Sequence, residues 1–335
     1  MIGTGAAIFG CAGQTLTAAE RDFFRDYDPL GFIIFARNVE TPEQLTRLTA
    51  DLRDAVGRDA PILVDQEGGR VQRLRSPYWR EWDAPLDTVA KAGARAVQAM
   101  SLRAMVIAAE LRAVGIDANC APVADIAGPD THPFLRNRCY GQTAETVSPI
   151  ARAVAEAHLA MGVLPVVKHM PGHGRSINDT HHDLPTVSTD RATLNATDFA
   201  PFRALADLPM AMTAHIVFSA YDSLPATQSP RMIKVIREEI GFAGLLITDD
   251  LNMQALAGSL GQRTARSMAA GCDIALHCKG DMAEMLEVAT AAGTMNSAAR
   301  VRAAAALAQR RSAKSVDIAA LEAEFSALLG ESAHG

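Results

Sequence analysis

Residues 166–185, VVKHMPGHGRSINDTHHDLP, gather the side chains that could do acid and base chemistry. This stretch holds four histidines, one lysine and two aspartates. It begins as the apolar run 163–167 ends, a pattern typical of a buried strand leading into a loop. The PGHG sequence excludes a helix there, so His169 and His173 cannot share a helical face as the histidines of a zinc-protease helix do. An irregular backbone must place them.

Asp179 and His181 are the candidate proton-transfer pair of this loop, separated by one threonine. An aspartate that reaches an imidazole fixes its tautomer and raises its pKa, which makes a general acid that works near neutral pH. The alternative is a surface or structural histidine, the commoner role of a histidine in a loop. The neighbouring aspartate favours the catalytic interpretation.

Charged residues at two strand ends are candidates for ligand binding. Lys168 and His169 emerge directly from a predicted strand, placed to hydrogen-bond sugar hydroxyls or a carboxylate; the alternative is a lysine paired with a nearby carboxylate. Asp65 also ends an apolar run, and a carboxylate suits the paired hydroxyls of a sugar. Arg73 follows within VDQEGGRVQRLR, whose charged residues could instead form an ion-pair network. Neither GxGxxG nor GKS/T is present, so this glycine pair does not indicate a phosphate cradle.

Asp249 and Asp250 follow the apolar run 245–248, so a carboxylate leaves the end of a strand that should be fully buried. A carboxylate fixed there can attack an electrophilic carbon and form a covalent ester intermediate. Helix capping or loop solvation is the alternative. Because neighbouring side chains alternate in direction along an extended backbone, we expect only one of the two to face the site.

Eight short apolar runs recur along the chain, and a helical pattern follows nearly every one. Eight strand–helix units are the signature of a (β/α)8 TIM-type barrel, and 335 residues suit that fold. A doubly wound open sheet is the competing α/β layout, but it seldom has eight such units. The runs are 6–11, 31–35, 61–64, 116–122, 163–167, 210–214, 245–248 and 274–276.

Helical patterns separate these runs. Thr17 with Glu20 forms a capping-box signature, and Thr41 precedes a proline at the first helical position. No linker, repeat or low-complexity tract marks a second domain, so we expect one domain over residues 1–335. Further helices are expected at 89–114, 145–161, 194–205, 231–240, 262–270 and 282–291, with extra C-terminal helices at 297–310 and 316–329.

In a barrel the carboxyl ends of the strands meet at one face, where the active sites of this fold are built. Every strong polar cluster of the chain falls at such an end. This coincidence favours an enzyme, with a non-enzymatic sugar-binding protein as the alternative. The clusters are 37–38, Asp65, 125–138, 168–169, His215, 249–250 and His277.

Composition narrows the range of partners and compartments. A net charge of −6 and a pI of about 5.9, without a block of like charges, argue against nucleic acid and against a membrane-surface helix. The N-terminus lacks a basic flank and glycines break its apolar part, so it does not resemble a signal peptide, and no run approaches a membrane span. Five scattered cysteines without CxxC predict reduced thiols in a cytoplasmic protein.

Together, four motifs resemble glycoside hydrolase family 3: VDQEGGRVQR, APVAD at 121–125, KHMPGHG followed by DTH, and ITDDLNM. More narrowly, they are similar to the single-domain β-N-acetylglucosaminidases of bacterial peptidoglycan recycling. The resemblance covers residues 31–277. It implies a (β/α)8 barrel that cleaves terminal β-linked N-acetylglucosamine with retention, from fragments such as GlcNAc-1,6-anhydroMurNAc muropeptides.

The resemblance also implies roles by position. It makes Asp249 the nucleophile, His181 the general acid/base and Asp179 the residue that orients His181. Three positions depart from the family pattern: Cys139, before the aromatic Tyr140, in place of Ser, Met170 in place of Phe, and Thr180 in place of Ser. The implied sugar-binding set is Asp65, Arg73, Arg138, Lys168 and His169.

Other activities stay open at this point. A family 3 phosphorylase would use phosphate in place of water, and a histidine acid does not repel an incoming phosphate anion. A β-glucosidase would use the same chemistry on another sugar. A metal-dependent barrel hydrolase could draw ligands from the histidines and aspartates, although no standard ligand spacing is met. The resemblance implies no metal and no cofactor, only a small sugar as partner.

Overall fold

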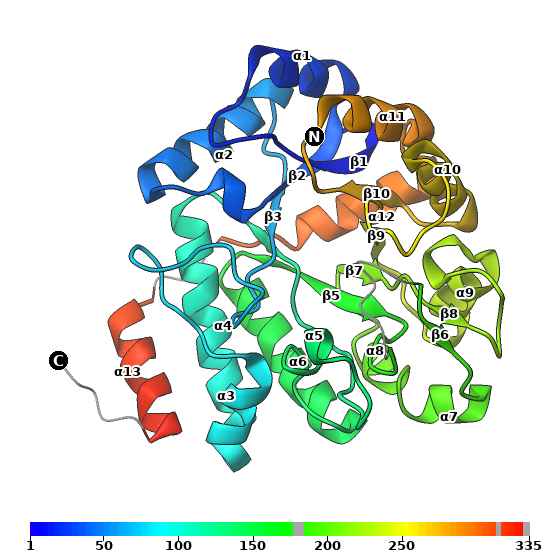
Figure 1. The fold of residues 1–335 in the computed structure, drawn as a ribbon. Coiled ribbons are helices and arrows are strands. Elements are labelled where there is room, and N and C mark those ends of the chain that lie inside the picture. Colours follow the sequence, from blue (N-terminus) through cyan, green and yellow to red (C-terminus); the bar gives the residue numbers. More distant parts are fainter. Residues whose placement is uncertain (177–183, 313–315, 331–335) are drawn as a thin grey trace.

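A computed structural model describes residues 1–176, 184–312 and 316–330 of the chain. Within these segments eight parallel strands close into a barrel surrounded by helices (Figure 1). Their order around the barrel is β1-β10-β9-β7-β5-β4-β3-β2. Each strand overlaps one of the eight apolar runs, so the predicted (β/α)8 barrel is confirmed and the doubly wound sheet is wrong. The strands are β1 Gly5–Gly10, β2 Pro29–Ile34, β3 Ile62–Val64, β4 Ala118–Asn119, β5 Leu164–Met170, β7 Met210–Thr213, β9 Leu245–Asp250 and β10 Ile274–His277.

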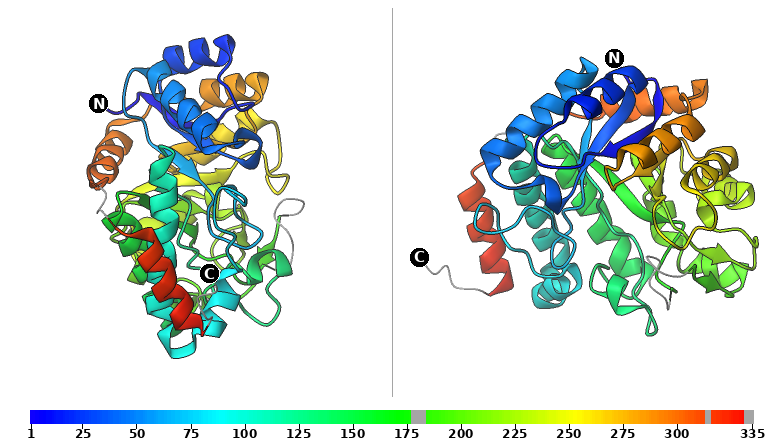
Figure 2. Two further views of the ribbon diagram at one scale, coloured as in Figure 1. Left: turned by 90° about the vertical axis from the view of Figure 1, so that its left-hand side faces the viewer. Right: turned by 45° about the horizontal axis from the view of Figure 1, so that its top comes forward.

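Helices cover the outside of the barrel, and Figure 2 shows the long loops gathered at one of its ends. The Thr17–Glu20 capping box is confirmed, and the Thr41 side chain accepts a hydrogen bond from the Gln44 N–H. A small two-stranded sheet, β6 Thr186–Val187 with β8 Val217–Phe218, lies outside the barrel. The helices before the C-terminus are α1 Ala18–Tyr27, α2 Pro42–Val56, α3 Pro85–Ala92, α4 Ala96–Ala113, α5 Pro133–Arg136, α6 Ala144–Ala160, α7 Arg191–Ala196, α8 Ala200–Ala204, α9 Pro230–Lys234, α10 Leu260–Ala270 and α11 Met282–Ala292.

Three of the expected helices are interrupted. The prediction of one helix over 89–114 is wrong, because Gly93 adopts a φ of 54° and ends α3 before α4 begins. The stretch 194–205 divides between α7 and α8 at the non-helical Thr197. The stretch 231–240 changes from α9 into the π-helical turn Val235–Glu239. Hydrophobic spacing alone continues across such breaks, so it does not reveal them.

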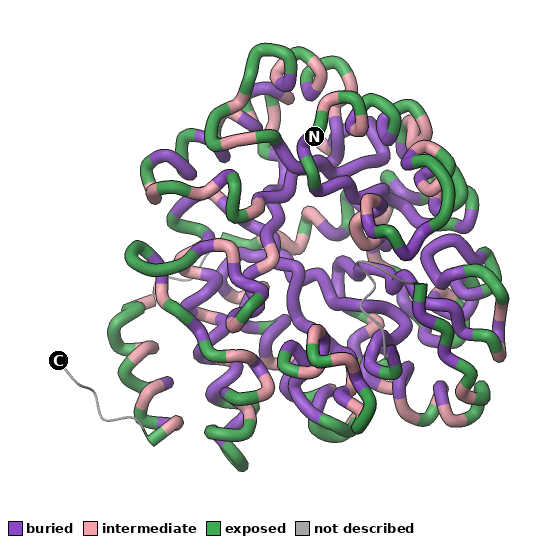
Figure 3. The backbone as a smooth tube through the Cα atoms, viewed as in Figure 1, coloured by how far each residue is buried: buried purple, intermediate pink, exposed green. Residues whose placement is uncertain are grey.

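Alternate residues along the strands belong to two different cores. Leu164 and Val166 of β5, like Leu245 and Ile247 of β9, pack inside the barrel. Leu246, between the latter two, packs outward against the helices. This is the two-residue period of a pleated strand. Figure 3 shows a buried centre inside a shell of half-exposed helices, and the barrel strands are buried on both faces except at Asp249 and Asp250, the end of β9.

Helix α12, Ser297–Ala308, closes the end of the barrel where the strands begin. Its alanines, Ala299, Ala303 and Ala306, join the core inside the barrel. In the left view of Figure 2, α12 (orange) lies on one side of the strands and the long loops lie on the other. Small side chains allow this close approach, and the opposite mouth is left for the site.

Helix α13, Ile318–Leu329, packs against α4 and α3, so both expected C-terminal helices are confirmed. Its Phe325 meets Trp82 edge to face at 5.4 Å, and Glu322 pairs with Arg80 at 3.2 Å. Trp82 belongs to the loop after β3, which α13 therefore supports from outside. Among the helices of the described segments, none is both long enough and apolar enough to span a membrane.

Asp273 anchors α12 to the barrel and yields a test of the fold. This 2% exposed carboxylate accepts hydrogen bonds from Arg302 of α12, from Arg237 and from the Leu246 N–H. Asp273→Ala should lower the free energy of unfolding by about 3 kcal/mol, because two arginines lose their shared buried acceptor. Urea denaturation followed by circular dichroism measures this.

Asp207→Ala is the matched control. Its side chain is 71% exposed and pairs with one arginine, Arg152. A solvated pair contributes less than about 1 kcal/mol. Equal losses in the two variants would contradict the anchoring role of Asp273.

Candidate active site

A cavity of about 120 Å³ opens at the carboxyl ends of the barrel strands. The side chains that face into the barrel, every second residue along a strand, continue into this cavity. Leu63 inside β3 is followed two residues later by Asp65, Val166 by Lys168, and Ile247 by Asp249. The same period that buries apolar side chains along the axis thus delivers charged ones at the mouth. The lining residues are Ile33, Phe35, Asp65, Val71, Arg73, Phe134, Arg138, Lys168, His169, His173, Met212, Asp249, Asp250, Met253, Leu276 and Cys278.

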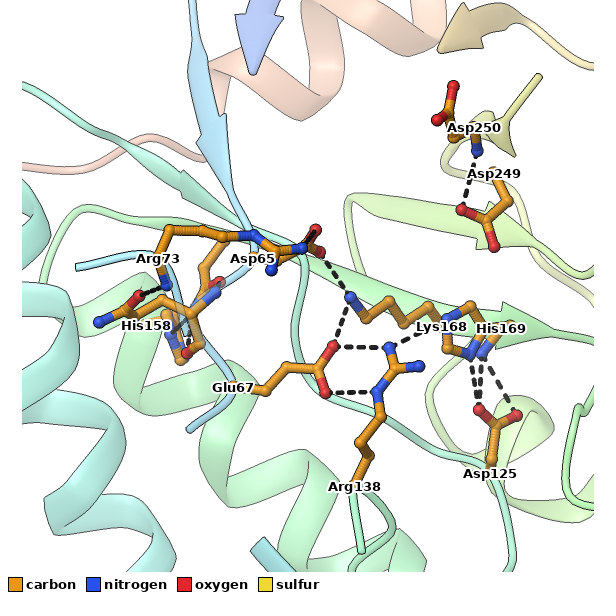
Figure 4. A network of polar contacts seen from close by, with 12 residues as sticks. Asp65, Glu67, Arg73, Asp125, Arg138, His158, Lys168, His169, Asp249 and Asp250 are labelled. Carbon is orange, nitrogen blue, oxygen red and sulfur yellow. Dashed lines mark hydrogen bonds and ion pairs between the residues drawn. The ribbon is translucent and has the colours of Figure 1, made fainter. Parts of the chain in front are cut away.

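Two carboxylates and three cations form a connected network at this cavity (Figure 4), and all of them except the buried Glu67 belong to its lining. Lys168 Nζ lies 2.8 Å from Asp65 Oδ1 and 2.6 Å from Glu67 Oε1. Arg138 binds both oxygens of Glu67, each at 2.8 Å, and Arg73 Nη2 donates to Asp65 Oδ2 at 2.9 Å. The two carboxylates therefore share Lys168, and each also has an arginine of its own.

Charge pairing in this network overcomes burial. Burial would raise the pKa of both carboxyls, but Lys168 and Arg73 hold that of Asp65 well below its usual range. Arg138 and Lys168 likewise lower the pKa of Glu67 to about 2. Burial would lower the pKa of Lys168, yet Asp65 and Glu67 raise it above its usual value. All of these groups keep their charges throughout the neutral range.

Asn119 and His158 hold the end of β3 from behind the network. The Asn119 side chain accepts a hydrogen bond from the Gln66 N–H at 3.0 Å and donates to the Gln66 carbonyl at 3.1 Å. Burial lowers the pKa of His158 to about 4, so its neutral ring accepts from Asn119 at 2.9 Å. The Gln66 side chain in turn accepts from the Arg73 N–H. These neutral hydrogen bonds fix the backbone between Asp65 and Arg73.

His169 is bonded on both sides of its ring. Its Nδ1 lies 2.7 Å from Asp125 Oδ2, and Arg138 Nη2 lies 3.4 Å from its Nε2. Burial, with help from Arg138, lowers the pKa of His169 to about 3, so the ring is neutral. Asp125 also accepts the His173 N–H at 2.7 Å. The carboxylate thus ties together the backbone at both histidines of the KHMPGHG motif.

Asp249 and Asp250 face different ways, as strand alternation predicts. In Figure 4 the Asp249 carboxylate points toward the side of Lys168 and His169, and that of Asp250 points away from it. The Asp250 N–H donates to Asp249 Oδ1 at 2.8 Å. Asp250 Oδ1 accepts from the backbone N–H groups of Asn252 and Cys278. Both residues line the cavity, and Asp249 is the one whose carboxylate turns toward Lys168 and His169.

The structure brings most of the predicted site residues together. Asp179 and His181 lie in 177–183, outside the described residues. Those that line the one cavity are Asp65, Arg73, Arg138, Lys168, His169 and Asp249. A larger hollow of about 630 Å³ lies beside them, between residues 126–131, the start of α6 and Thr186–Thr189 in the described part, and none of these six lines it.

Two central residues were not assigned to the site from the sequence. The sequence offers Glu67 only as a possible member of a local ion-pair network, but its partners, Arg138 and Lys168, come from distant segments. Asp125 was one member of a polar loop and is in fact the hydrogen-bond acceptor for His169. The usable signal was position, because each lies within a few residues of a barrel strand end.

A closed parallel barrel with a charged pocket at the carboxyl ends of its strands defines a barrel enzyme whose active site lies at that mouth. Residues 12–310 match the model of the glycosyl hydrolase family 3 N-terminal domain. The chain belongs to glycosyl hydrolase family 3 and is a glycoside hydrolase.

Individual relatives agree with this assignment. The β-hexosaminidase of Stenotrophomonas maltophilia is 35% identical over 300 residues, covering 87% of this chain and 89% of that protein. The β-hexosaminidase of Alkalilimnicola ehrlichii is 38% identical over 282 residues, covering 82% and 80%. NagZ from Neisseria gonorrhoeae, solved in complex with N-trifluoroacetyl-D-glucosamine, has a TM-score of 0.84 at 30% identity, covering 98% of this chain and 97% of that chain.

Asp250 generates a pH prediction. Burial, with the neighbouring charge of Asp249 adding, raises the pKa of Asp250 from an ordinary 3.8 to about 6. The folded state therefore binds a proton more tightly than the unfolded state, so this stability is present below about pH 4 and is lost as the pH rises through 6. Relative to Asp250→Asn, the wild-type chain should lose about 2 kcal/mol across that window, a figure reduced for the partial exposure of this residue. Urea midpoints measured at pH 4, 5, 6 and 7 check this, and parallel pH curves for the two proteins would refute it.

Proposed function

We propose that this chain is a retaining exo-β-N-acetylglucosaminidase. The observation that carries the proposal is the cavity of about 120 Å³ that Asp249 lines together with charged donors and acceptors, including Lys168 and Asp65. The β-hexosaminidase relatives, and a NagZ solved with a glucosamine derivative, support the choice of sugar.

The mechanism assigns the first bond to Asp249. Its carboxylate attacks the anomeric carbon while His181 protonates the leaving oxygen, through an oxocarbenium-like transition state. Water deprotonated by His181 then releases the sugar with net retention. Retaining enzymes usually pair two carboxylates about 5 Å apart, and in this proposal a histidine oriented by Asp179 replaces the second one.

The network of Asp65, Lys168 and Arg73 provides sugar recognition, and its members keep their charges while the sugar binds. Asp65 is held by Lys168 and Arg73, so its oxygens are oriented before a sugar hydroxyl arrives. The apolar side chains of Phe134 and Met253 line the same cavity and suit the carbon face of a ring or an acetyl methyl group. Polar groups then orient the sugar, and apolar ones exclude water from it.

We infer the natural substrate from the motif resemblance described above, and the compartment from the cysteines. GlcNAc-1,6-anhydroMurNAc muropeptides, the products of peptidoglycan turnover, present the terminal β-linked N-acetylglucosamine that the mechanism requires. All five cysteines are buried free thiols, which suits a reducing cytoplasm. Release of free N-acetylglucosamine from such a muropeptide, measured by mass spectrometry, tests this. If only simple aryl glycosides react, the muropeptide assignment is wrong.

Asp249→Ala and His181→Ala should each lower turnover of 4-nitrophenyl N-acetyl-β-glucosaminide by at least about 1,000-fold, because each removes a group that makes or breaks a bond. Azide should partly restore Asp249→Ala by attacking the anomeric carbon directly, giving an N-acetylglucosaminyl azide of inverted configuration. Asp207→Ala, on the exposed surface, is the activity control. Near-normal hydrolysis by either site variant would contradict the catalytic role proposed for the substituted residue.

Variations of the glycoside assay distinguish the competing activities. Phosphate that accelerates turnover and yields a sugar 1-phosphate would make the chain a phosphorylase. Faster cleavage of the aryl glucoside than of the N-acetylglucosaminide would make it a β-glucosidase. Exhaustive chelation should leave the rate unchanged, and a loss restored by one metal would indicate a metal-dependent hydrolase. Proton NMR of the first product should show the β anomer.

A further inference from the structure

Arg103 of α4 is a buried guanidinium held by neutral oxygens. It is 1% exposed and is the largest fully buried side chain of the described chain. Its Nη2 donates to the carbonyls of Glu67 and Asp83, at 2.8 and 2.7 Å, and its Nη1 donates to Thr88 Oγ1 at 2.5 Å. Within the described segments no carboxylate forms an ion pair with it. The side chain thus bonds both ends of the loop 67–83.

Arg103 is charged, and an aromatic ring and a glycine lie close to its guanidinium. Burial lowers its pKa to about 10, which leaves it protonated at neutral pH. Its guanidinium lies 5.3 Å from the centre of the Trp82 ring, and Arg80 lies 4.8 Å from that ring. A Cβ on Gly68, where φ is 103°, would lie 1.8 Å from Arg103 Nη2. The loop therefore approaches this guanidinium as closely as a glycine backbone allows.

A buried charge without a counter-ion costs free energy that an apolar side chain of the same size would not. Filling the space behind the loop therefore does not explain an arginine. What an arginine adds is a rigid planar fork that fixes two carbonyls at once. One of them belongs to Glu67, whose buried carboxylate binds Lys168 and Arg138, two cations that line the cavity.

We propose that Arg103 is a positioning residue for sugar binding, acting through Glu67. It holds the Glu67 backbone so that the carboxylate presents both oxygens to the two cations that line the cavity. When the hold is lost, Lys168 and Arg138 lose their shared alignment and bind the sugar less well. The proposal rests on this cavity being the sugar site. Turnover depends mainly on Asp249 and His181, so the effect is expected on binding.

Arg103→Met and Arg103→Lys test this, with Thr88→Val as the matched control. Met keeps the bulk and makes no hydrogen bond; Lys keeps a charge that reaches one carbonyl. Thr88→Val removes the third bond of Arg103 and leaves both loop carbonyls held. The probes are 4-nitrophenyl N-acetyl-β-glucosaminide for KM and kcat, and free N-acetylglucosamine for inhibition.

Arg103→Met should raise KM and the inhibition constant together by about tenfold, with kcat changed less than about twofold. Arg103→Lys should fall between Met and wild type, and Thr88→Val should match wild type in KM while losing some stability. If KM and the inhibition constant are unchanged in both Arg103 variants while stability falls, Arg103 is structural only. If Arg103→Met does not fold, Arg103→Lys is compared with Thr88→Val in the same way.

A second measurement does not depend on the substrate. Amide hydrogen exchange of residues 67–83, read by mass spectrometry without any sugar, should rise in Arg103→Met and stay at the wild-type level in Thr88→Val. Equal exchange in wild type and Arg103→Met would overturn the proposal. A wild-type chain that does not cleave the glycoside would instead contradict the proposed function, and the exchange result would still judge whether Arg103 holds the loop.

A double-mutant cycle tests the route through Glu67. In a Glu67→Gln background the carboxylate charge that Arg103 positions is already absent. Arg103→Lys should then change KM much less than it does in the wild-type background. Additive effects of the two substitutions would show that Arg103 acts by another route.

Discussion

The shared salt bridge between Glu67 and its two cations is the interaction on which the site depends. Lys168 arrives from β5, Arg138 from the loop before α6, and Glu67 from the loop after β3. At 1% side-chain exposure, the Glu67 carboxylate has almost no water to replace a missing partner. Removing one member would leave the others as uncompensated buried charges, so the three segments are energetically coupled. Local geometry at the cavity is therefore a property of the whole network.

The barrel places the contacts that stabilise the fold and the charged network of the site at opposite ends of its strands. At the end where the strands begin, Asp117 and Asp273 are surrounded by arginines, and α12 fills the mouth with alanines. These contacts join distant parts of the chain and touch no residue of the cavity. At the opposite end the same strands terminate in charged residues. A core that is closed at the other end thus leaves the strand ends available for the polar groups of the site.

Much of the fold was predictable because buried parallel strands are read as continuous apolar runs. All eight barrel strands lie where such runs stand in the sequence. The break at Gly93 was not predictable from spacing, since the alanine-rich pattern continues on both sides of it. Strand period also placed Asp65, Lys168 and Asp249 at one mouth. It explains why Asp249, two residues after the inward-facing Ile247, faces the cavity.

Partners that meet only in three dimensions were beyond the sequence. Glu67 stands beside Arg70 and Arg73 in the chain, so a local pair was the natural expectation, but its actual partners are 71 and 101 residues away. Arg103 stands in the alanine-rich helical pattern 89–114, where no neighbouring residue marks it as buried. Arg103 is buried because the loop after β3 packs over α4. This contact is between distant segments, so no local sequence pattern predicts it.

The charge states of the pocket limit what can make its activity depend on pH. Pairing keeps Glu67 and Lys168 charged, while burial lowers the pKa of His169 and His173 to about 3 and keeps both neutral. None of these described groups changes protonation between about pH 5 and pH 8. Asp250, with its pKa raised to about 6, is the described lining residue that does, and its backbone hydrogen bond to Asp249 links the two. If the hydrolysis rate changes near pH 6 on the acidic side of its pH profile, the titration of Asp250, beside the proposed nucleophile, would account for it. The proposed acid/base His181 would add its own contribution.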